Sequence, residues 1–312
     1  MSNRALALRQ LLSGNKIAKC AGAHNAAGAR LAQQVGFDAV WSSSFEISAS
    51  YCVPDASILS MSDYLHVAQS ISESVLIPVI ADCDTGYGNA ANVAYAVRKF
   101  EAAGAAAISI EDQSFPKTNS LTPGAKKLVS VAEFADKIRS AKQAQDSPDF
   151  VVIARIEALI AGAGQREAQQ RATAYADAGA DAVLIHWNQA SAEPILRFLQ
   201  EWNHAVPVIV VPTTYYEVSS QELSLLGARM VIYANQGMRS AMRAMEEIFQ
   251  GILADGTSAN IESHLWPVTR ILEDLQGVRN AECSSIATTS AQRSTILSSH
   301  PANDRRRAID RS

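Results

Sequence analysis

The sequence is short of cysteine, of long apolar runs and of clustered basic residues, and each shortage excludes a class of protein. Four cysteines occur among 312 residues, at Cys20, Cys52, Cys83 and Cys283, and none forms a Cys-x-x-Cys pair. Structural zinc sites and disulfide frameworks are usually built from closely spaced cysteines. We therefore expect buried free thiols in a reducing compartment.

No stretch of the chain approaches the about 18 consecutive apolar residues of a membrane-spanning helix. Residues 1–12 lack the apolar segment of a secretory signal. The formal net charge is −4, and no basic stripe alternates with aromatic residues as it does on nucleic-acid-binding surfaces. We expect a cytoplasmic protein that binds neither membrane nor nucleic acid.

Short apolar segments recur along the chain, and the stretches between them have the spacing of amphipathic helices. This spacing is clear at 92–103 and 166–178, which are followed by Gly104 and Gly179, and glycine commonly ends a helix. The expected strands are Ile17–Ala21, Ala39–Trp41, Ile77–Ala81, Ala105–Ile110, Phe150–Ala154, Ala182–Ile185, Val206–Val211 and Met230–Tyr233. Eight alternating units predict an α/β fold, a parallel (β/α)8 barrel of the TIM type, with a doubly wound open sheet as the alternative.

This alternation stops near residue 282. Residues 1–281 are predicted to form one catalytic domain, a barrel followed by C-terminal helices. From 282 to 312 the chain is rich in Ser, Thr, Asn and Arg, with three adjacent arginines at 305–307. Such a composition buries too little apolar surface to offset the entropy of folding, so we expect a disordered tail.

Acidic residues follow two neighbouring predicted strands, Asp82 and Asp84 after one and Glu111 and Asp112 after the next. Alternate residues of an extended chain point to the same side, so Asp82 and Asp84 are expected to share a face. The loops after barrel strands converge on one mouth, where these carboxylates would repel one another. Mg²⁺ prefers oxygen ligands and would relieve that repulsion. We predict a magnesium site, with helix caps or ion pairs as the alternative.

Two further predicted strands end in polar residues, Arg155 and His186. A guanidinium at the barrel mouth binds a carboxylate through two hydrogen bonds, and an imidazole donates one to a developing oxyanion. Each residue could instead serve as an ion-pair or backbone partner. Their joint placement with the acids favours an active site.

The segment 113–129 is long for a connection between a barrel strand and its helix. It combines prolines and a glycine with Lys117, Asn119 and Ser120. A lid of this kind excludes water and completes the polar contacts to a charged intermediate. A surface insertion without function is the alternative. Before it, Gly86 and Gly88 could offer backbone N–H groups to an anion.

Several motifs between about Leu11 and Met245 resemble those of the phosphoenolpyruvate mutase/isocitrate lyase superfamily. They are Gly22-Ala-His, Phe45-Glu-Ile-Ser-Ala-Ser, Val53-Pro-Asp, Ala81-Asp-Cys-Asp-Thr-Gly-Tyr-Gly-Asn, Ile110-Glu-Asp, Phe115-Pro-Lys-Thr-Asn-Ser and Glu157-Ala-Leu-Ile-Ala-Gly. The resemblance is to the mutase branch. It implies the isomerisation of phosphoenolpyruvate to 3-phosphonopyruvate, which forms the C–P bond of phosphonate biosynthesis.

The resemblance also implies roles for individual residues. Asp82 would bind Mg²⁺ directly, and Asp84 and Glu111 would hold its waters. Asp55 would lie beside the migrating phosphoryl group. Residues implied to bind substrate are Arg155 at the carboxylate, His186 and Asn119 at the phosphoryl oxygens, Trp41, Ser43 and Ser44 at the pyruvate end, and Lys117 and Ser120 from the loop.

Three positions depart from the mutase pattern. Gln113 stands where mutases usually carry Lys, Ser44 where a Gly is common, and Ile156 where Thr is usual. We expect these departures to affect substrate fit and rate more than metal binding.

Three alternatives remain beside the mutase. The C–C lyases of the superfamily carry a catalytic Cys on the loop, and this loop has none. Phosphonopyruvate hydrolases share the acids and the arginine but usually lack the loop Asn, so Asn119 favours the mutase. A barrel that binds anions without turnover is disfavoured by the intact Asp55, Lys117 and Asn119.

The resemblance implies two kinds of partner besides the small-molecule substrate. Because the mutase equilibrium is expected to favour phosphoenolpyruvate, a phosphonopyruvate decarboxylase or a similar irreversible step should follow in the pathway. A homodimer or homotetramer is expected, formed by swapping a helix that lies within Gln236–Leu253.

Overall fold

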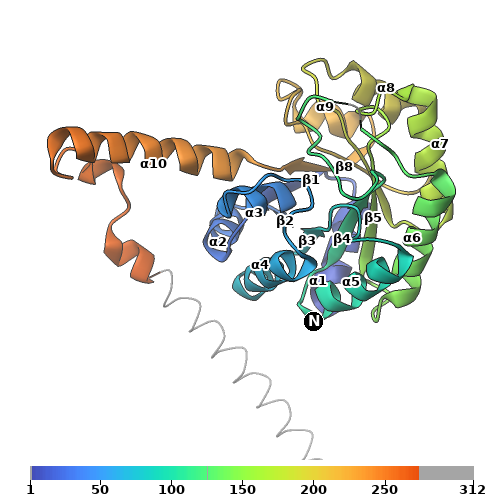
Figure 1. Cartoon of the computed structure of the whole chain (residues 1–312), viewed down its shortest axis with the longest axis horizontal. Helices are drawn as coiled ribbons and strands as arrows, with labels where there is room; N and C mark the ends of the chain where they lie inside the picture. Colours follow the sequence, from blue (N-terminus) through green and yellow to red (C-terminus); the bar gives the residue numbers. More distant parts are fainter. Residues whose placement is uncertain (1, 125, 274–312) are drawn as a thin grey trace, which may run out of the picture. The chain divides into compact units, whose positions relative to one another are not determined.

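The computed structural model describes residues 2–124 and 126–273 (Figure 1). The chain divides into two compact units, Met1–Ala244 and Met245–Ser312. In the first unit eight parallel strands form a closed barrel in the order β1 to β8, and helices surround it (Figure 1). The predicted (β/α)8 barrel is confirmed. The predicted tail, 282–312, lies outside the described residues.

Each predicted strand overlaps an observed one, although most boundaries shift by one or two residues. The strands are β1 (Ala18–Ala23), β2 (Ala39–Ser42), β3 (Val79–Asp82), β4 (Ala107–Glu111), β5 (Val151–Ile156), β6 (Ala182–Ile185), β7 (Val208–Val210) and β8 (Ala228–Tyr233). The pairing of β1 with β8 closes the barrel, with Ala18 opposite Met230. All eight C-terminal strand ends therefore meet at one mouth.

Helices lie in the connections between the strands, before β1 and after β8. They are α1 (Ser2–Ser13), α2 (Ala26–Gln34), α3 (Ser44–Ser50), α4 (Met61–Ser74), α5 (Ala90–Ala102), α6 (Val131–Ala144), α7 (Gly164–Asp177), α8 (Glu193–Glu201), α9 (Ser220–Leu225) and α10 (Gln236–Asp255), with a 3₁₀ turn at Glu262–His264. Asn89 caps α5 by accepting hydrogen bonds from the N–H groups of Ala91 and Asn92. Gly104 and Gly179, with φ of +89° and +104°, end α5 and α7 as predicted.

The N-terminal end of the barrel is closed by α1. Its Ala5, Leu8 and Leu12 are buried in one cluster with inward-facing strand residues such as Ile80 and Met230. Burying a leucine side chain contributes roughly 1.5–3 kcal/mol. Because α1 occupies this end, the opposite end is left for chemistry.

Three of the predicted free thiols lie in the described residues. Cys20 and Cys83 are buried free cysteines, as predicted. Cys52 is also free but exposed, so the expectation of burial was wrong there: it lies in the turn after α3 with φ of +56°. Cys283 lies outside the described residues. Among the residues described, no helix is both long and apolar enough to cross a membrane.

Candidate active site

A cavity of about 60 Å³ lies at the C-terminal ends of the strands. The predicted site residues that line it are Trp41, Ser43, Ser44, Asp55, Asp82, Lys117, Asn119, Ser120, Arg155 and His186. Asp84 and Glu111 are buried beside this cavity but do not line it. The structure thus gathers the predicted residues in one place.

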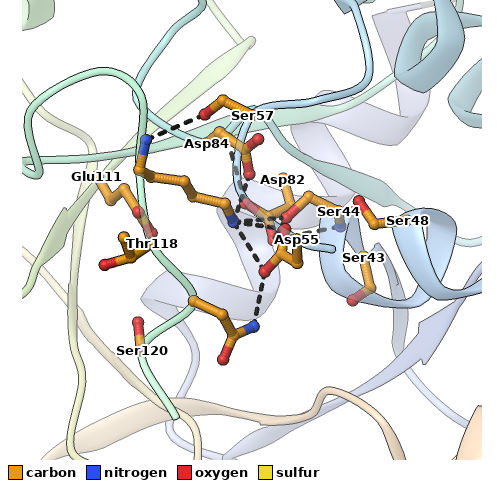
Figure 2. A network of polar contacts seen from close by, with 12 residues as sticks. Ser43, Ser44, Ser48, Asp55, Ser57, Asp82, Asp84, Glu111, Thr118 and Ser120 are labelled. Atoms are coloured by element: carbon orange, nitrogen blue, oxygen red, sulfur yellow. Dashed lines mark hydrogen bonds and ion pairs between the residues drawn. The ribbon is translucent and has the colours of Figure 1, made fainter. Parts of the chain in front are cut away.

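The ammonium group of Lys117 lies at the centre of an acidic cluster (Figure 2). Its Nζ atom is 2.6 Å from Asp84 Oδ1 and 2.9 Å from Asp55 Oδ1, and it donates to Ser44 Oγ at 3.2 Å. Burial alone would lower the pKa of Lys117, but Asp84 and Asp55 raise it well above its usual value. Lys117 is therefore a fixed positive charge on the 113–129 loop.

Asp82 is the last residue of β3, and α3 fixes its orientation. Its Oδ2 atom accepts hydrogen bonds from Ser44 Oγ at 2.8 Å and from the backbone N–H of Ser44 at 3.3 Å. Ser43 caps α3 by accepting from the N–H of Glu46. The cap places the first turn of α3 against Asp82, whose other carboxylate oxygen, Oδ1, accepts only a long hydrogen bond of 3.4 Å from the backbone N–H of Asp84.

The extended-chain argument for Asp82 and Asp84 was wrong. Strand β3 ends at Asp82, and Asp84 has φ of +49°, in the left-handed region, so alternation does not apply beyond the strand. Asp84 instead turns toward Lys117. Burial raises the pKa of Asp84 to about 6, although Lys117 opposes the shift.

Glu111, at the end of β4, contacts groups from two sides. Its Oε1 accepts from Gln113 Nε2 at 3.0 Å, and its Oε2 lies 3.2 Å from Arg155 Nε. Burial raises the pKa of Glu111 to about 8, more than Arg155 lowers it. Gln113, one of the departures from the mutase pattern, therefore supports a candidate metal-site carboxylate. The N–H of Thr118 donates to Gln113 Oε1 at 3.4 Å, which ties that carboxamide to the loop.

Arg155 and His186 share a partner that the sequence reasoning missed, Glu157. Its Oε1 accepts from Arg155 Nε at 2.6 Å and lies 2.9 Å from His186 Nδ1, and its Oε2 accepts from Ser120 Oγ at 2.9 Å. Burial opposes ionisation, yet Arg155 and His186 hold the pKa of Glu157 well below its usual range. Residues 155 and 157 are two apart at the end of β5, a spacing that could have revealed the pair.

Other lining residues were also missed. Thr213 and Asn235 follow β7 and β8 and line the cavity, and Asn235 Nδ2 donates to Thr213 Oγ1 at 3.4 Å. Asp112, by contrast, points away from the mouth toward α7. There it accepts from Arg171 Nη1 at 3.1 Å and Tyr175 Oη at 2.9 Å.

The 113–129 loop crosses the site and is anchored at several points. The N–H of Lys117 donates to Ser57 Oγ at 3.1 Å, and Asn119 Nδ2 donates to Asp55 Oδ2 at 2.7 Å (Figure 2). Asn188 Nδ2 donates to the Ser120 carbonyl at 2.8 Å. Lys117, Asn119, Ser120 and Leu121 of the loop line the cavity beneath it.

The chemistry of the donor set fits a magnesium ion. Within the part of the chain that the structure describes, no three His, Cys, Asp or Glu side chains form a metal cage. Mg²⁺ does not require one, since it usually retains waters and binds one or two carboxylates. Five carboxylates surround two basic side chains here: Asp55, Asp82, Asp84, Glu111 and Glu157 around Lys117 and Arg155. A divalent cation near Asp82 would offset this excess negative charge.

The sequence is similar throughout the barrel to proteins of known function. The family described as phosphoenolpyruvate phosphomutase matches residues 8–253. Phosphonopyruvate hydrolase from Variovorax sp. (strain Pal2) is 48% identical over 273 residues, covering 87% of this chain and 94% of the relative.

Two solved structures have the same fold. The crystal structure of phosphoenolpyruvate phosphomutase from Streptomyces platensis subsp. rosaceus has a TM-score of 0.87 and 52% identity, covering 90% of this chain and 98% of its own. A phosphonopyruvate hydrolase in complex with oxalate and Mg²⁺ has a TM-score of 0.85 and 44% identity, with the same coverage of 90% and 98%. The chain is an enzyme of the phosphoenolpyruvate mutase/isocitrate lyase superfamily and belongs to the phosphoenolpyruvate phosphomutase family.

Proposed function

We propose that this enzyme interconverts phosphoenolpyruvate and 3-phosphonopyruvate by intramolecular phosphoryl transfer. The observation that carries the proposal is the contact of Asn119 Nδ2 with Asp55 Oδ2 at 2.7 Å, beside Lys117 on the same carboxylate. Through it the loop presents an amide and an ammonium group inside the cavity. The 52% identity to a phosphoenolpyruvate phosphomutase structure supports this activity.

The proposed roles follow from the charge of the reacting groups. Phosphoryl transfer passes through a loose transition state that requires positioned positive charge and hydrogen-bond donors rather than a strong nucleophile. Arg155 would bind the substrate carboxylate, and His186 and Asn119 would donate to the phosphoryl oxygens. Asp55 orients Lys117 and Asn119 by accepting hydrogen bonds from both.

The remaining residues would hold the metal and the pyruvate end. A Mg²⁺ ion bound by Asp82, with its waters held by Asp84 and Glu111, would supply stabilisation of the enolate oxygen. Trp41, Ser43 and Ser44 would line the pyruvate end, because all three border the cavity. The loop, including Ser120, would keep water away from the phosphoryl group during transfer.

Phosphonopyruvate hydrolysis is the second candidate, favoured by the 48% identity to the Variovorax hydrolase. The two reactions differ only in whether the phosphoryl group reaches the enolate oxygen or water. A C–C lyase is disfavoured because Cys20, Cys52 and Cys83, the cysteines of the described residues, do not line the cavity.

Phosphorus NMR separates these candidates. Purified enzyme with Mg²⁺ and 3-phosphonopyruvate should show a growing phosphoenolpyruvate signal and no inorganic phosphate. Inorganic phosphate in its place would assign the hydrolase, and no change would assign a barrel without turnover. Because the equilibrium is expected to favour phosphoenolpyruvate, we also propose that a phosphonopyruvate decarboxylase consumes the product in the cell. Adding such an enzyme to the same sample should drain the phosphoenolpyruvate signal.

A further inference from the structure

We infer that Glu157 is a positioning residue that couples the 113–129 loop to Arg155 and His186. The inference rests on the proposed function in one respect, that Arg155 and His186 face the anionic groups of the substrate. It does not depend on whether the phosphoryl group is transferred to oxygen within the substrate or to water. Glu157 does not line the cavity, so it acts through residues that do.

The carboxylate of Glu157 joins three separate parts of the site. The side chain is fully buried, and its two oxygens contact Arg155 from β5, His186 after β6 and Ser120 from the loop. A buried carboxylate is costly unless every oxygen is satisfied by donors or opposite charge. Here each of the three partners is also a cavity-lining residue. Movement of any one partner therefore removes a hydrogen bond from a buried oxygen of Glu157 and changes the hydrogen bonds that the other two partners can form.

Ser120 is the link between the loop and this network. Its hydroxyl donates to Glu157 Oε2 at 2.9 Å, and its oxygen accepts from Arg155 Nη2 at 3.0 Å. Any displacement of Ser120 would remove the same partner from a buried carboxylate oxygen of Glu157 and from an N–H of the Arg155 guanidinium. Closure of the loop and orientation of Arg155 are thus parts of one hydrogen-bonded unit.

The imidazole ring of His186 also contacts Glu157 and Arg155. Its Nδ1 atom lies 2.9 Å from Glu157 Oε1 and 2.9 Å from Arg155 Nη2. One nitrogen cannot donate to the carboxylate and accept from the guanidinium at once. The balance between these contacts decides where the His186 proton lies, and hence whether Nε2 offers a proton or a lone pair to a ligand.

Binding of oxalate with Mg²⁺ tests the inference without turnover, since a related hydrolase binds both. Glu157→Gln keeps the shape of the side chain and removes its charge. We expect oxalate affinity to fall about tenfold to a hundredfold by calorimetry, because the acceptor that Arg155 and His186 share loses its negative charge. Amide exchange at 117–121 should become faster. Glu201→Gln, the same change in an exposed ion pair on α8, is the matched control and should alter neither measurement.

A double-mutant cycle tests the coupling itself. Ser120→Ala should weaken oxalate binding in the wild-type background and have little further effect in Glu157→Gln. Additive losses would contradict the coupling. If Glu157→Gln does not fold, as judged by circular dichroism, the ring ¹⁵N shifts of His186 in Ser120→Ala alone test the inference. In the described residues the Ser120 hydroxyl forms hydrogen bonds with Glu157 and Arg155 and none with His186, so a change in the His186 ring ¹⁵N shifts must pass through Glu157 or Arg155.

These ring shifts can be assigned in ¹⁵N-histidine-labelled full-length protein with a His186→Asn variant. Unchanged shifts in Ser120→Ala and in Glu157→Gln would overturn the inference. The outcome is separable from that of the phosphorus NMR experiment. Release of phosphate would replace the proposed activity and leave the coupling intact, whereas additive binding losses would remove the coupling and leave the activity.

Discussion

Asp82 is the single residue on which the proposed metal site most depends. Replacing it with alanine removes the carboxylate expected to bind Mg²⁺ directly. We expect Mg²⁺ affinity to fall by at least about tenfold, or ~1.4 kcal/mol, and turnover to become undetectable. Calorimetry with MgCl₂ and phosphorus NMR measure the two effects. Asp136→Ala, which removes an exposed carboxylate on α6, is the control. Unchanged Mg²⁺ affinity in Asp82→Ala would place the ion elsewhere.

Two carboxyls of the site give a pH prediction. Burial raises the pKa of Asp84 to about 6 and that of Glu111 to about 8. Because the folded protein holds these protons more tightly than the unfolded chain, the metal-free protein should lose stability as pH rises from about 4, where carboxyls of the unfolded chain titrate, to about 6 for Asp84 and about 8 for Glu111. Mg²⁺ favours the deprotonated forms, so it should stabilise more over the same range.

Thermal unfolding in EDTA and in MgCl₂ at pH 5 to 9 tests this prediction. The difference in Tm between the two series should widen between about pH 6 and pH 8. A constant difference would mean that neither Asp84 nor Glu111 responds to the ion. Asp82→Ala should show a smaller difference at every pH, because it lacks the proposed direct ligand.

Sequence reasoning located single residues well where they end a strand, and poorly where the chain turns. Asp82, Glu111 and Arg155 were expected at the mouth and are found there. The alternation rule was applied to Asp84, where a left-handed residue breaks it, and not to Glu157, which does meet Arg155. Whether a strand continues past its apolar run depends on tertiary contacts, which a periodic pattern does not contain.

The loop between β4 and α6 is the element whose contacts distinguish the candidate reactions. Asn119→Ala removes one hydrogen bond to a carboxylate, worth about 1.5–3 kcal/mol. We expect kcat/KM for phosphonopyruvate to fall about tenfold to a hundredfold. Inorganic phosphate should also appear among the products, because a loosened loop admits water. Asn203→Ala, in an exposed surface loop, is the control. A variant with wild-type rate and no phosphate would remove Asn119 from the proposed mechanism.

Elements were predictable because strand and helix carry different apolar periods, and the eight predicted strands are all present. The close approach of Gly22 to Ala234 could not be predicted from these periods. A Cβ atom there would lie 2.2 Å from the Ala234 carbonyl oxygen, so only glycine lets β1 and the end of β8 meet. That requirement comes from two segments more than 200 residues apart. The sequence alone offered Gly22 merely as part of a motif.

For the molecule as a whole, α10 carries an apolar stripe. Met238, Met242, Met245, Phe249 and Ile252 follow one another at intervals of four and three residues. Met238 is buried, whereas the exposed fractions of Met242, Met245 and Phe249 are 56%, 47% and 59%. Spacing of this kind forms the seam between packed helices. We propose that a second copy of this chain covers the stripe, in line with the expected helix exchange.

Phe249→Glu tests that assembly, because a charge in the seam of two packed helices must be desolvated without a partner. Light scattering after gel filtration should give a dimer or tetramer for the wild type and a smaller species for Phe249→Glu. Gln250→Glu adds the same charge beside the stripe at an exposed position, and it should retain the wild-type assembly. A wild-type chain that is monomeric at high micromolar concentration would contradict the proposal. Equal dissociation of both variants would attribute the effect to net charge rather than to the apolar seam.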